Sequence, residues 1–210
     1  MCVILVGKKT DLLKLELQAA WNNNPHGAGF SYVSDGRARI VKGLMKYDDM
    51  VGALSACKYR GLISLHLRYA THGRVCVNNT HPFKVGRFEA LAHNGVLSAF
   101  GESGAAGASD SADLANVLGG LRNPIDRDKI LRSIGGMYAL TTPRARGGIA
   151  LFGSNSWQTY RGVRCSNTYW IPRAQPVGGV SAARAGVWGW RFTDDDNAND
   201  ANGRGGLINV

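Results

Sequence analysis

The strongest structural signal in this sequence is the stretch GLISLHLRYA at residues 61–70, in which side chains alternate with a period of two. One face of the stretch carries Leu62, Ser64, His66 and Arg68, and the other carries Ile63, Leu65, Leu67 and Tyr69. Successive side chains of a β-strand point to opposite faces of its sheet, so this period predicts a strand. Its fully apolar run, on the second face, is typical of a strand that packs on a core.

Other segments predict a mixture of strands and helices in a fixed order. Strands are predicted at 2–7, 28–33, 37–43, 88–97, 136–142, 148–153, 157–163, 165–172 and 186–192. Helices are predicted at about 10–21, 48–59, 109–121 and 127–134. Ser34-Asp35-Gly36 joins two of the strands as a hairpin turn. This order fits an α+β fold, in which antiparallel sheets carry helices on their outer faces, better than a regular βαβ alternation.

The length of 210 residues and the 44% of hydrophobic residues predict a single domain, which we place at residues 1–192. From Thr193 the chain reads TDDDNANDANGRGG and has no large apolar residue before Leu207, so we expect 193–210 to be a disordered tail. No stretch approaches the roughly 20 apolar residues of a membrane helix, and the N-terminal 20 residues lack a signal peptide. We therefore expect a cytoplasmic protein that does not engage a membrane.

The net charge of +10 invites a nucleic-acid partner, but its distribution does not favour one. There is no run of five or more Lys and Arg residues and no known nucleic-acid-binding signature. The four cysteines form no CxxC pair, and the five histidines fit no zinc spacing. We expect reduced thiols, no metal and no cofactor.

Cys2 directly follows the initiator methionine. Removal of Met1 leaves a thiol and a free α-amine on one residue, and part of that amine is unprotonated at neutral pH. An N-terminal amine that activates its own side chain is a known catalytic arrangement. The alternative is a small buried residue at the start of a strand, a common position for free cysteine.

Three further motifs have ordinary readings when each is taken alone. Asn94-Gly95 in LAHNGVL (91–97) reads as a tight turn. Arg68 in LRYATHG (67–73) reads as one half of a surface ion pair. Asp110 and Asp113 in SDSADLA (109–115) read as carboxylates at a helix N-terminus.

Taken together with Cys2, these motifs resemble the glutaminase domain of class II glutamine amidotransferases, which are N-terminal nucleophile (Ntn) hydrolases. The resemblance covers about residues 1–170, and NNPHGAGF (23–30) is similar to the short stand-alone members. Val3 stands where the family usually has glycine. The fold implied is a four-layer αββα sandwich of two antiparallel sheets flanked by helices.

The resemblance also implies roles for individual residues. Cys2 is the nucleophile, and Asn94 with the backbone N–H of Gly95 forms the oxyanion hole. Arg68 grips the substrate carboxylate, Thr71, His72 and Gly73 shape the same wall, and Asp110, with Asp113 as the competing candidate, holds the substrate ammonium. We expect His81 and His93 to make structural hydrogen bonds near this site.

The activity implied is hydrolysis of the glutamine side-chain amide through a Cys2 thioester, which releases glutamate and ammonia. The expected partner is a separate synthetase or ligase that accepts the ammonia. Two alternatives stay open at this stage. The chain is a stand-alone hydrolase of a γ-glutamyl amide, or it is a catalytically weak binding module with a basic surface.

Overall fold

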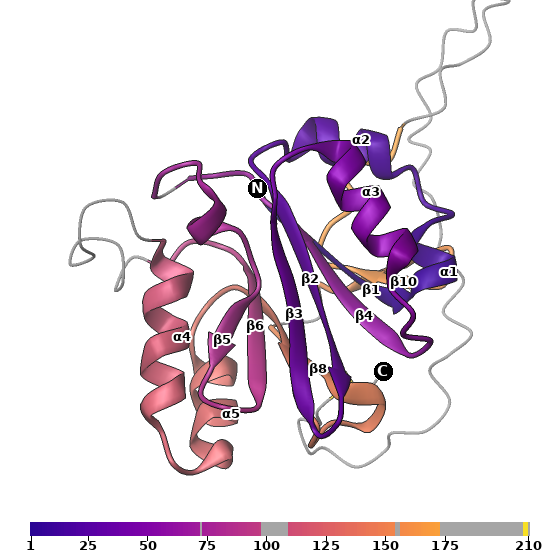
Figure 1. The fold of residues 1–210 in the computed structure, drawn as a ribbon. Coiled ribbons are helices and arrows are strands. Elements are labelled where there is room, and N and C mark those ends of the chain that lie inside the picture. The colour runs from indigo at the N-terminus through magenta and orange to yellow at the C-terminus, as the bar shows by residue number, and fades with distance from the viewer. Residues whose placement is uncertain (72, 98–108, 154–155, 173–207, 210) are drawn as a thin grey trace, which may run out of the picture. The chain divides into compact units, whose positions relative to one another are not determined.

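Two antiparallel sheets carry the fold (Figure 1). The computed structural model describes residues 1–71, 73–97, 109–153, 156–172 and 208–209. The predicted strand at 186–192, His72 and most of the predicted tail lie outside the described residues. The predicted α+β class with antiparallel sheets is confirmed.

The first sheet contains the N-terminal strand near its middle. Its strands run in the order β3-β2-β4-β1-β10-β9. They are β1 (Val3–Lys8), β2 (Ala28–Ser34), β3 (Arg37–Leu44), β4 (Leu62–Leu67), β9 (Gln158–Tyr160) and β10 (Val163–Cys165). Val3 pairs with Leu67 between β1 and β4, so the residue before β1, Cys2, comes level with Arg68 just after β4.

The second sheet has the order β11-β8-β7-β6-β5. Its strands are β5 (Phe83–Val85), β6 (Glu89–Asn94), β7 (Met137–Thr141), β8 (Ile149–Phe152) and β11 (Ile208–Asn209). Strand β6 ends at Asn94, which pairs with Met137 of β7. The Asn94-Gly95 motif therefore stands at the end of a strand inside this sheet, rather than at the tip of a two-residue hairpin.

Helices cover the outer face of each sheet (Figure 1). On the first sheet they are α1 (Lys9–Leu12), α2 (Leu17–Asn23) and α3 (Tyr47–Ala56), and on the second they are α4 (Asp110–Gly120) and α5 (Pro124–Ser133). Short 3₁₀ helices occupy Val77–Asn79 and Arg146–Gly148. Ser109 caps α4 by accepting a hydrogen bond from the N–H of Ala112, as expected of a serine in this position. None of the helices in the described residues is long and apolar enough to cross a membrane.

The alternation of residues 61–70 separates two environments, as predicted. Ile63, Leu65 and Leu67 join the core under α1, α2 and α3. Ser64 and His66 are buried on the opposite face, and His66 Nε2 lies 3.0 Å from the carbonyl oxygen of His93 in the second sheet. The space between the sheets is thus partly polar. It also holds an apolar cluster formed by Ile4, Val6, Ala92, Ala139, Ile149, Leu151 and Trp157.

Two predictions of element boundaries are wrong. The predicted helix at 10–21 is two short helices, α1 and α2, separated by a turn at 13–16. The turn allows Leu12, Leu15 and Leu17 to be buried together, which a continuous helix with leucines at these spacings would not permit. The predicted strands at 157–163 and 165–172 are β9 and β10, which a tight turn at Arg161-Gly162 joins and which end at Cys165.

Glu89, at the start of β6 in the second sheet, is a buried charge with several hydrogen-bond donors. Its carboxylate accepts hydrogen bonds from Thr142 Oγ1 at 2.6 Å, Arg127 Nη1 at 2.7 Å and Arg144 Nε at 3.0 Å. Burial raises the pKa of Glu89, but these donors and the charge of Arg144 outweigh burial and hold the pKa below its ordinary value. The carboxylate is therefore ionised and paired in the folded protein at neutral pH.

Glu89→Gln is expected to lower the free energy of unfolding by about 3 kcal/mol, because it leaves Arg127 without its buried counter-charge and Arg144 with Asp128 alone. Urea denaturation at neutral pH measures this change. The matched control is Glu16→Gln, which removes a partly exposed carboxylate paired with Arg161 at 2.9 Å and is expected to cost less than about 1 kcal/mol. Equal losses in the two variants would contradict the assignment.

Candidate active site

Cys2 lies against the backbone of Tyr69, at the point where β4 ends. The N–H of Tyr69 donates to Cys2 Sγ at 3.3 Å, and the thiol donates to the carbonyl oxygen of Tyr69 at 3.4 Å. Met1 is exposed and Val3 is fully buried, so the chain enters the core at Cys2. The thiol therefore sits at the boundary between the protein surface and the interior.

The protonation of this thiol is set mainly by burial, which raises the pKa of Cys2 above its ordinary value. The N–H of Tyr69, the N-terminal ammonium and Arg68 act in the opposite direction, and Asp110 reinforces burial. The net result is a protonated thiol at neutral pH. Any reaction at Cys2 consequently needs a base to take its proton.

Arg68 follows β4 and is itself buried. Its Nη1 donates to the carbonyl oxygen of Arg74 at 3.0 Å, and its Nη2 reaches the carbonyl oxygen of Gly73 at 3.5 Å. Burial lowers the pKa of Arg68, while Cys2, Cys76 and Asp110 raise it. The surface ion pair considered from the sequence is therefore wrong for Arg68, since the guanidinium lies inside the molecule.

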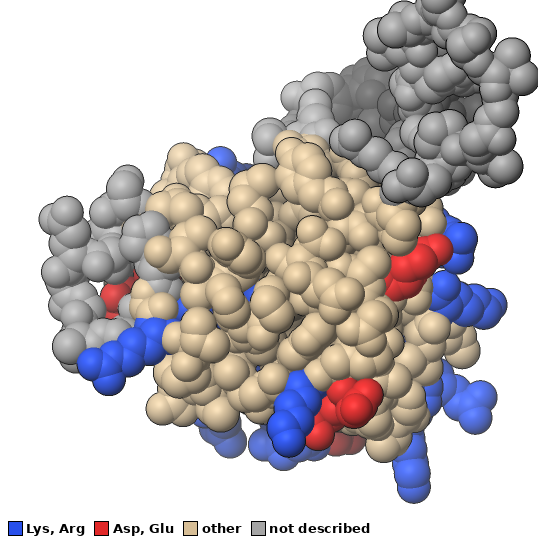
Figure 2. Space-filling view, turned by 90° about the horizontal axis from the view of Figure 1, so that it is seen from above, with Lys and Arg blue, Asp and Glu red and all other residues tan. Residues whose placement is uncertain are grey.

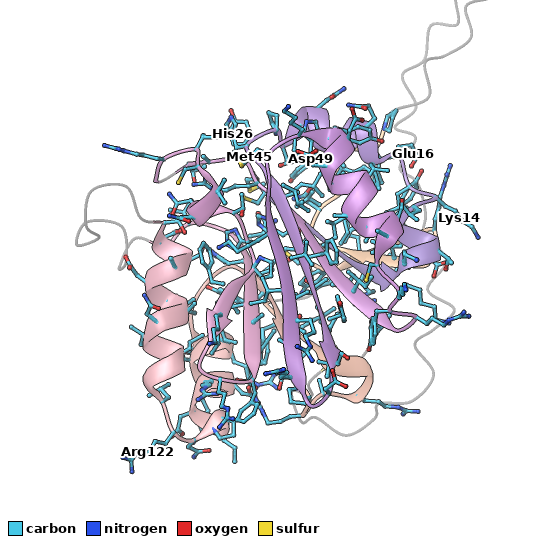
Figure 3. The ribbon with its side chains drawn as sticks, viewed as in Figure 1. Lys14, Glu16, His26, Met45, Asp49 and Arg122 are labelled. Atoms are coloured by element: carbon cyan, nitrogen blue, oxygen red, sulfur yellow. The ribbon has the colours of Figure 1, made fainter. Side chains whose placement is uncertain are left out.

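The segment after Arg68, which the resemblance implies to be a wall of the substrate site, runs along the protein surface. Thr71 and Gly73 are exposed on it, and His72 lies outside the described residues. The wall is tied to the loop before β2: the N–H of Ala70 donates to His26 Nδ1 at 2.9 Å, and the N–H of Arg68 donates to the carbonyl oxygen of Gly27 at 2.8 Å. Figure 3 shows His26 at the same end of the sheets as Met45, whose sulfur closes over Gly27.

Asp110 is the first residue of α4 and is buried. One carboxylate oxygen accepts from the N–H of Leu97 at 2.9 Å, and the other accepts from the N–H and the hydroxyl of Ser111 at 2.7 and 3.1 Å. The charge of Asp110 acts on both Cys2 and Arg68. Asp113 lies in the same first turn of α4 and is only partly buried.

Asn94 and Gly95 end β6 at the same level of the molecule. Asn94 is buried, and its Nδ2 lies 3.0 Å from Ser166 Oγ. A Cβ on Gly95 would stand 2.7 Å from His93 Nε2 and 3.1 Å from the Cα of Gly136, so any other residue would displace the backbone here. Close packing therefore favours glycine at this position.

Two residues next to the site, Ser166 and Asn167, were not predicted from the sequence. Ser166 Oγ accepts from the N–H of Ile4 at 2.9 Å, and Asn167 Nδ2 donates to the carbonyl oxygen of Cys2 at 2.7 Å. Both follow β10, which pairs with β1 through Leu5 and Cys165. Only a strand-pairing register could have found them, because they lie more than 160 positions from their partners.

Three buried histidines lie behind the site. His66 and His81 stack with ring centroids 3.9 Å apart, and His93 stacks on Tyr138 at 4.7 Å. His93 Nδ1 lies 2.9 Å from Ser111 Oγ, as the predicted structural hydrogen bond requires. The prediction is wrong for His81, both of whose ring nitrogens are buried without a hydrogen-bond partner among the described residues.

Metal ligands do not gather here or elsewhere in the described ranges: no group of three His, Cys, Asp or Glu side chains could hold an ion. The surface around the N-terminal end of the sheets is also poor in charge. Figure 2, which looks down on that end, shows Lys, Arg, Asp and Glu mainly at its margin. The net charge of +10 is therefore not concentrated where the site opens.

Hydrogen bonds and charge effects link Cys2, Arg68 and Asp110, while Asn94, which Gly95 follows, is linked to the strand of Cys2 through Ser166. Neither a scan against protein-family models nor a search of curated proteins finds a match to this chain. What the site does has to follow from its own residues.

Proposed function

We propose that this chain is a glutaminase of the class II amidotransferase type, with the four-layer αββα sandwich of the Ntn hydrolases. The observation that carries the proposal is that Cys2 hydrogen-bonds the backbone of Tyr69, next to Arg68, while Asp110 lies close enough for its charge to affect the pKa values of both Cys2 and Arg68. A nucleophile, a cation and an anion within mutual reach match an amino-acid amide, which has a carbonyl carbon, a carboxylate and an ammonium.

The first step requires Met1 to be removed, and the exposure of Met1 supports its access to an aminopeptidase. The new α-amine of Cys2 then takes the proton of the thiol. Because burial keeps this thiol protonated, an adjacent base is needed, and the α-amine is attached to the same residue. The sulfur attacks the side-chain carbonyl carbon of glutamine, and the carbonyl π-electrons move to the oxygen.

The resulting oxyanion is stabilised by the NH2 group of Asn94 and the N–H of Gly95. When the carbonyl reforms, the C–N bond breaks, and the departing nitrogen takes the proton held by the α-ammonium and leaves as ammonia. Water then attacks the thioester, its proton passing to the α-amine. The S–C bond breaks, the thiol regains its proton and glutamate is released.

The two ends of the substrate are held by opposite charges. The guanidinium of Arg68 binds the α-carboxylate, since its planar donors match the two oxygens. Asp110, whose carboxylate is fixed by three hydrogen bonds, binds the α-ammonium. The ammonia passes to a separate synthetase or ligase. If the chain acts alone, the same site hydrolyses a γ-glutamyl amide.

Intact mass spectrometry tests the proposal directly. The purified protein is measured before and after treatment with a diazo-ketone analogue of glutamine, which alkylates N-terminal cysteine nucleophiles. The expected result is a mass without Met1 and a single adduct at Cys2 that excess glutamine prevents. A processed chain that takes no adduct at Cys2 overturns the enzyme proposal and favours a binding module.

Arg68→Lys is expected to raise the KM for glutamine by about 10- to 100-fold with a smaller change in kcat, because a point charge replaces a bidentate contact. Steady-state glutamate release measures both constants. Arg74→Lys, a change at an exposed neighbour on the same wall, is the matched control and is expected to leave KM unchanged. Equal KM values in wild type and Arg68→Lys would remove Arg68 from substrate binding.

A further inference from the structure

The hydroxyl of Ser166 joins the strand of the nucleophile to the side chain of Asn94. It accepts one hydrogen bond from the N–H of Ile4 at 2.9 Å and another from Asn94 Nδ2 at 3.0 Å. All three residues are buried, so these bonds are not shared with bulk solvent. Ser166 therefore provides a polar link between β1 and the end of β6, beside the apolar packing of Ile4 and Val6 on Ala92.

When Asn94 Nδ2 faces Ser166, not every polar atom of these two side chains has a hydrogen-bond partner. Both lone pairs of the hydroxyl are occupied, and its proton has no acceptor in the described part of the chain. Asn94 Oδ1 is also buried and has no partner among the described residues. An unused donor and an unused acceptor thus lie on two side chains that already touch, and each unsatisfied buried group is unfavourable.

A half-turn of the amide pairs the two unused groups with each other. Oδ1 then lies where Nδ2 was and accepts the proton of Ser166, while Ser166 keeps the N–H of Ile4. The NH2 group moves to the buried position that Oδ1 leaves, where its donors have no acceptor among the described residues. A negative oxygen of a bound substrate would supply that acceptor.

We propose that Ser166 is a positioning residue that fixes the amide of Asn94 with its NH2 group toward the oxygen of the substrate. The inference rests on the glutaminase function proposed above. Ile4 is two residues from Cys2, and Asn167, the neighbour of Ser166, donates to the carbonyl oxygen of Cys2 at 2.7 Å. Ser166 and Asn167 therefore fix the position of the nucleophile, Cys2, relative to the oxyanion donor, Asn94.

A double-mutant cycle on the full chain tests this role. Ser166→Ala is expected to lower kcat by about 10- to 100-fold with KM for glutamine unchanged, since the amide then adopts both orientations. Asn94→Ala is expected to lower kcat by about 100- to 1,000-fold. The double variant is expected to be no slower than Asn94→Ala, because Ser166 acts only through that amide.

The control separates positioning from stability. Ser31→Ala removes another buried hydroxyl between the sheets, which lies 2.7 Å from Thr141 Oγ1 in a region away from Cys2. It is expected to lower the thermal midpoint by an amount similar to Ser166→Ala while leaving kcat unchanged. Should Ser166→Ala lack a cooperative unfolding transition, Ser166→Cys, which keeps the size with a weak donor, takes its place in the cycle.

The outcomes distinguish this inference from the proposed function. Two results would overturn the role of Ser166 and leave the proposed glutaminase function intact. In one, the losses in kcat of the single variants multiply in the double variant. In the other, the kcat of Ser166→Ala is within twofold of wild type. A wild-type protein with neither glutaminase activity nor a diazo-ketone adduct overturns the proposed function and the inference with it. Ser166→Ala is itself expected to be alkylated at nearly the wild-type rate, since alkylation forms no carbonyl oxyanion.

Discussion

Cys2→Ala is expected to abolish glutamine hydrolysis, with a loss in kcat on the order of 10⁴-fold or more. Alanine keeps the small side chain that allows Met1 to be removed, so the variant retains the α-amine and lacks only the sulfur. No thioester can form, and the remaining groups can bind glutamine without attacking it. Glutamate release at saturating glutamine measures the loss, and the diazo-ketone adduct should disappear with it.

The matched control is Cys76→Ala. Cys76 is a partly buried cysteine whose charge also acts on Arg68, so it shares the neighbourhood of Cys2 but not its position in the chain. Activity and adduct formation are expected to be unchanged in this variant. Turnover that survives in Cys2→Ala and disappears in Cys76→Ala would show that the wrong sulfur has been assigned.

The second large effect is a loss of stability in mild acid, caused by the three buried histidines. Burial is the main cause that lowers the pKa of His66 from 6.5 to about 3, that of His93 from 6.5 to about 4, and that of His81 well below 6.5. The unfolded chain therefore binds more protons than the folded chain between pH 6.5 and about 4. Stability is fully present above pH 6.5 and falls as the pH decreases through this window.

Each histidine is expected to reduce the free energy of unfolding by about 1 kcal/mol for each unit of pH lost within the window. Urea midpoints measured from pH 7.5 to 4.5 follow the decline. Because carboxylates such as Glu89 also titrate toward the lower end, the informative quantity is the difference between wild type and a histidine variant.

His81→Phe supplies that difference. Phenylalanine keeps a flat ring against His66 and Phe83 and removes two buried nitrogens that lack partners within the described residues. We expect stability at pH 7.5 to be retained and the decline with acid to be shallower by about 1 kcal/mol per pH unit. Parallel curves for the two proteins would mean that His81 takes no part in the acid effect.

Local patterns were sufficient to predict much of the fold. The alternation of residues 61–70 indicated which side chains enter the helix-covered core, and Ser34-Asp35-Gly36 predicted the hairpin between β2 and β3. Asp35 and Gly36 both have positive φ, 52° and 68°. Tight two-residue hairpin turns require positive φ at both central positions, and Asp-Gly adopts it readily. Both signals depend only on neighbours in the chain, so sequence alone contains them.

Features that depend on distant pairing could not be predicted. Leucine spacing favoured one helix at 10–21, but burial of Leu12, Leu15 and Leu17 against a single sheet outweighed helix continuity. Ser166 and Asn167 belong to no motif, and their importance arises only because β10 pairs with β1. From the sequence, Arg68 could equally form a surface ion pair. Its burial could not be predicted, because it depends on the following loop, which folds back over the guanidinium.

The central place of β1 also has a consequence for the order in which the chain is made and matured. The first strand synthesised gains its β4 neighbour only after residue 67 has been added, and its β10 neighbour only after residue 165. Contacts of such long sequence separation form late in folding. Under the proposed function, Met1 has to be removed before Asn167, which follows 165 positions later in the chain, donates its hydrogen bond to the carbonyl oxygen of Cys2.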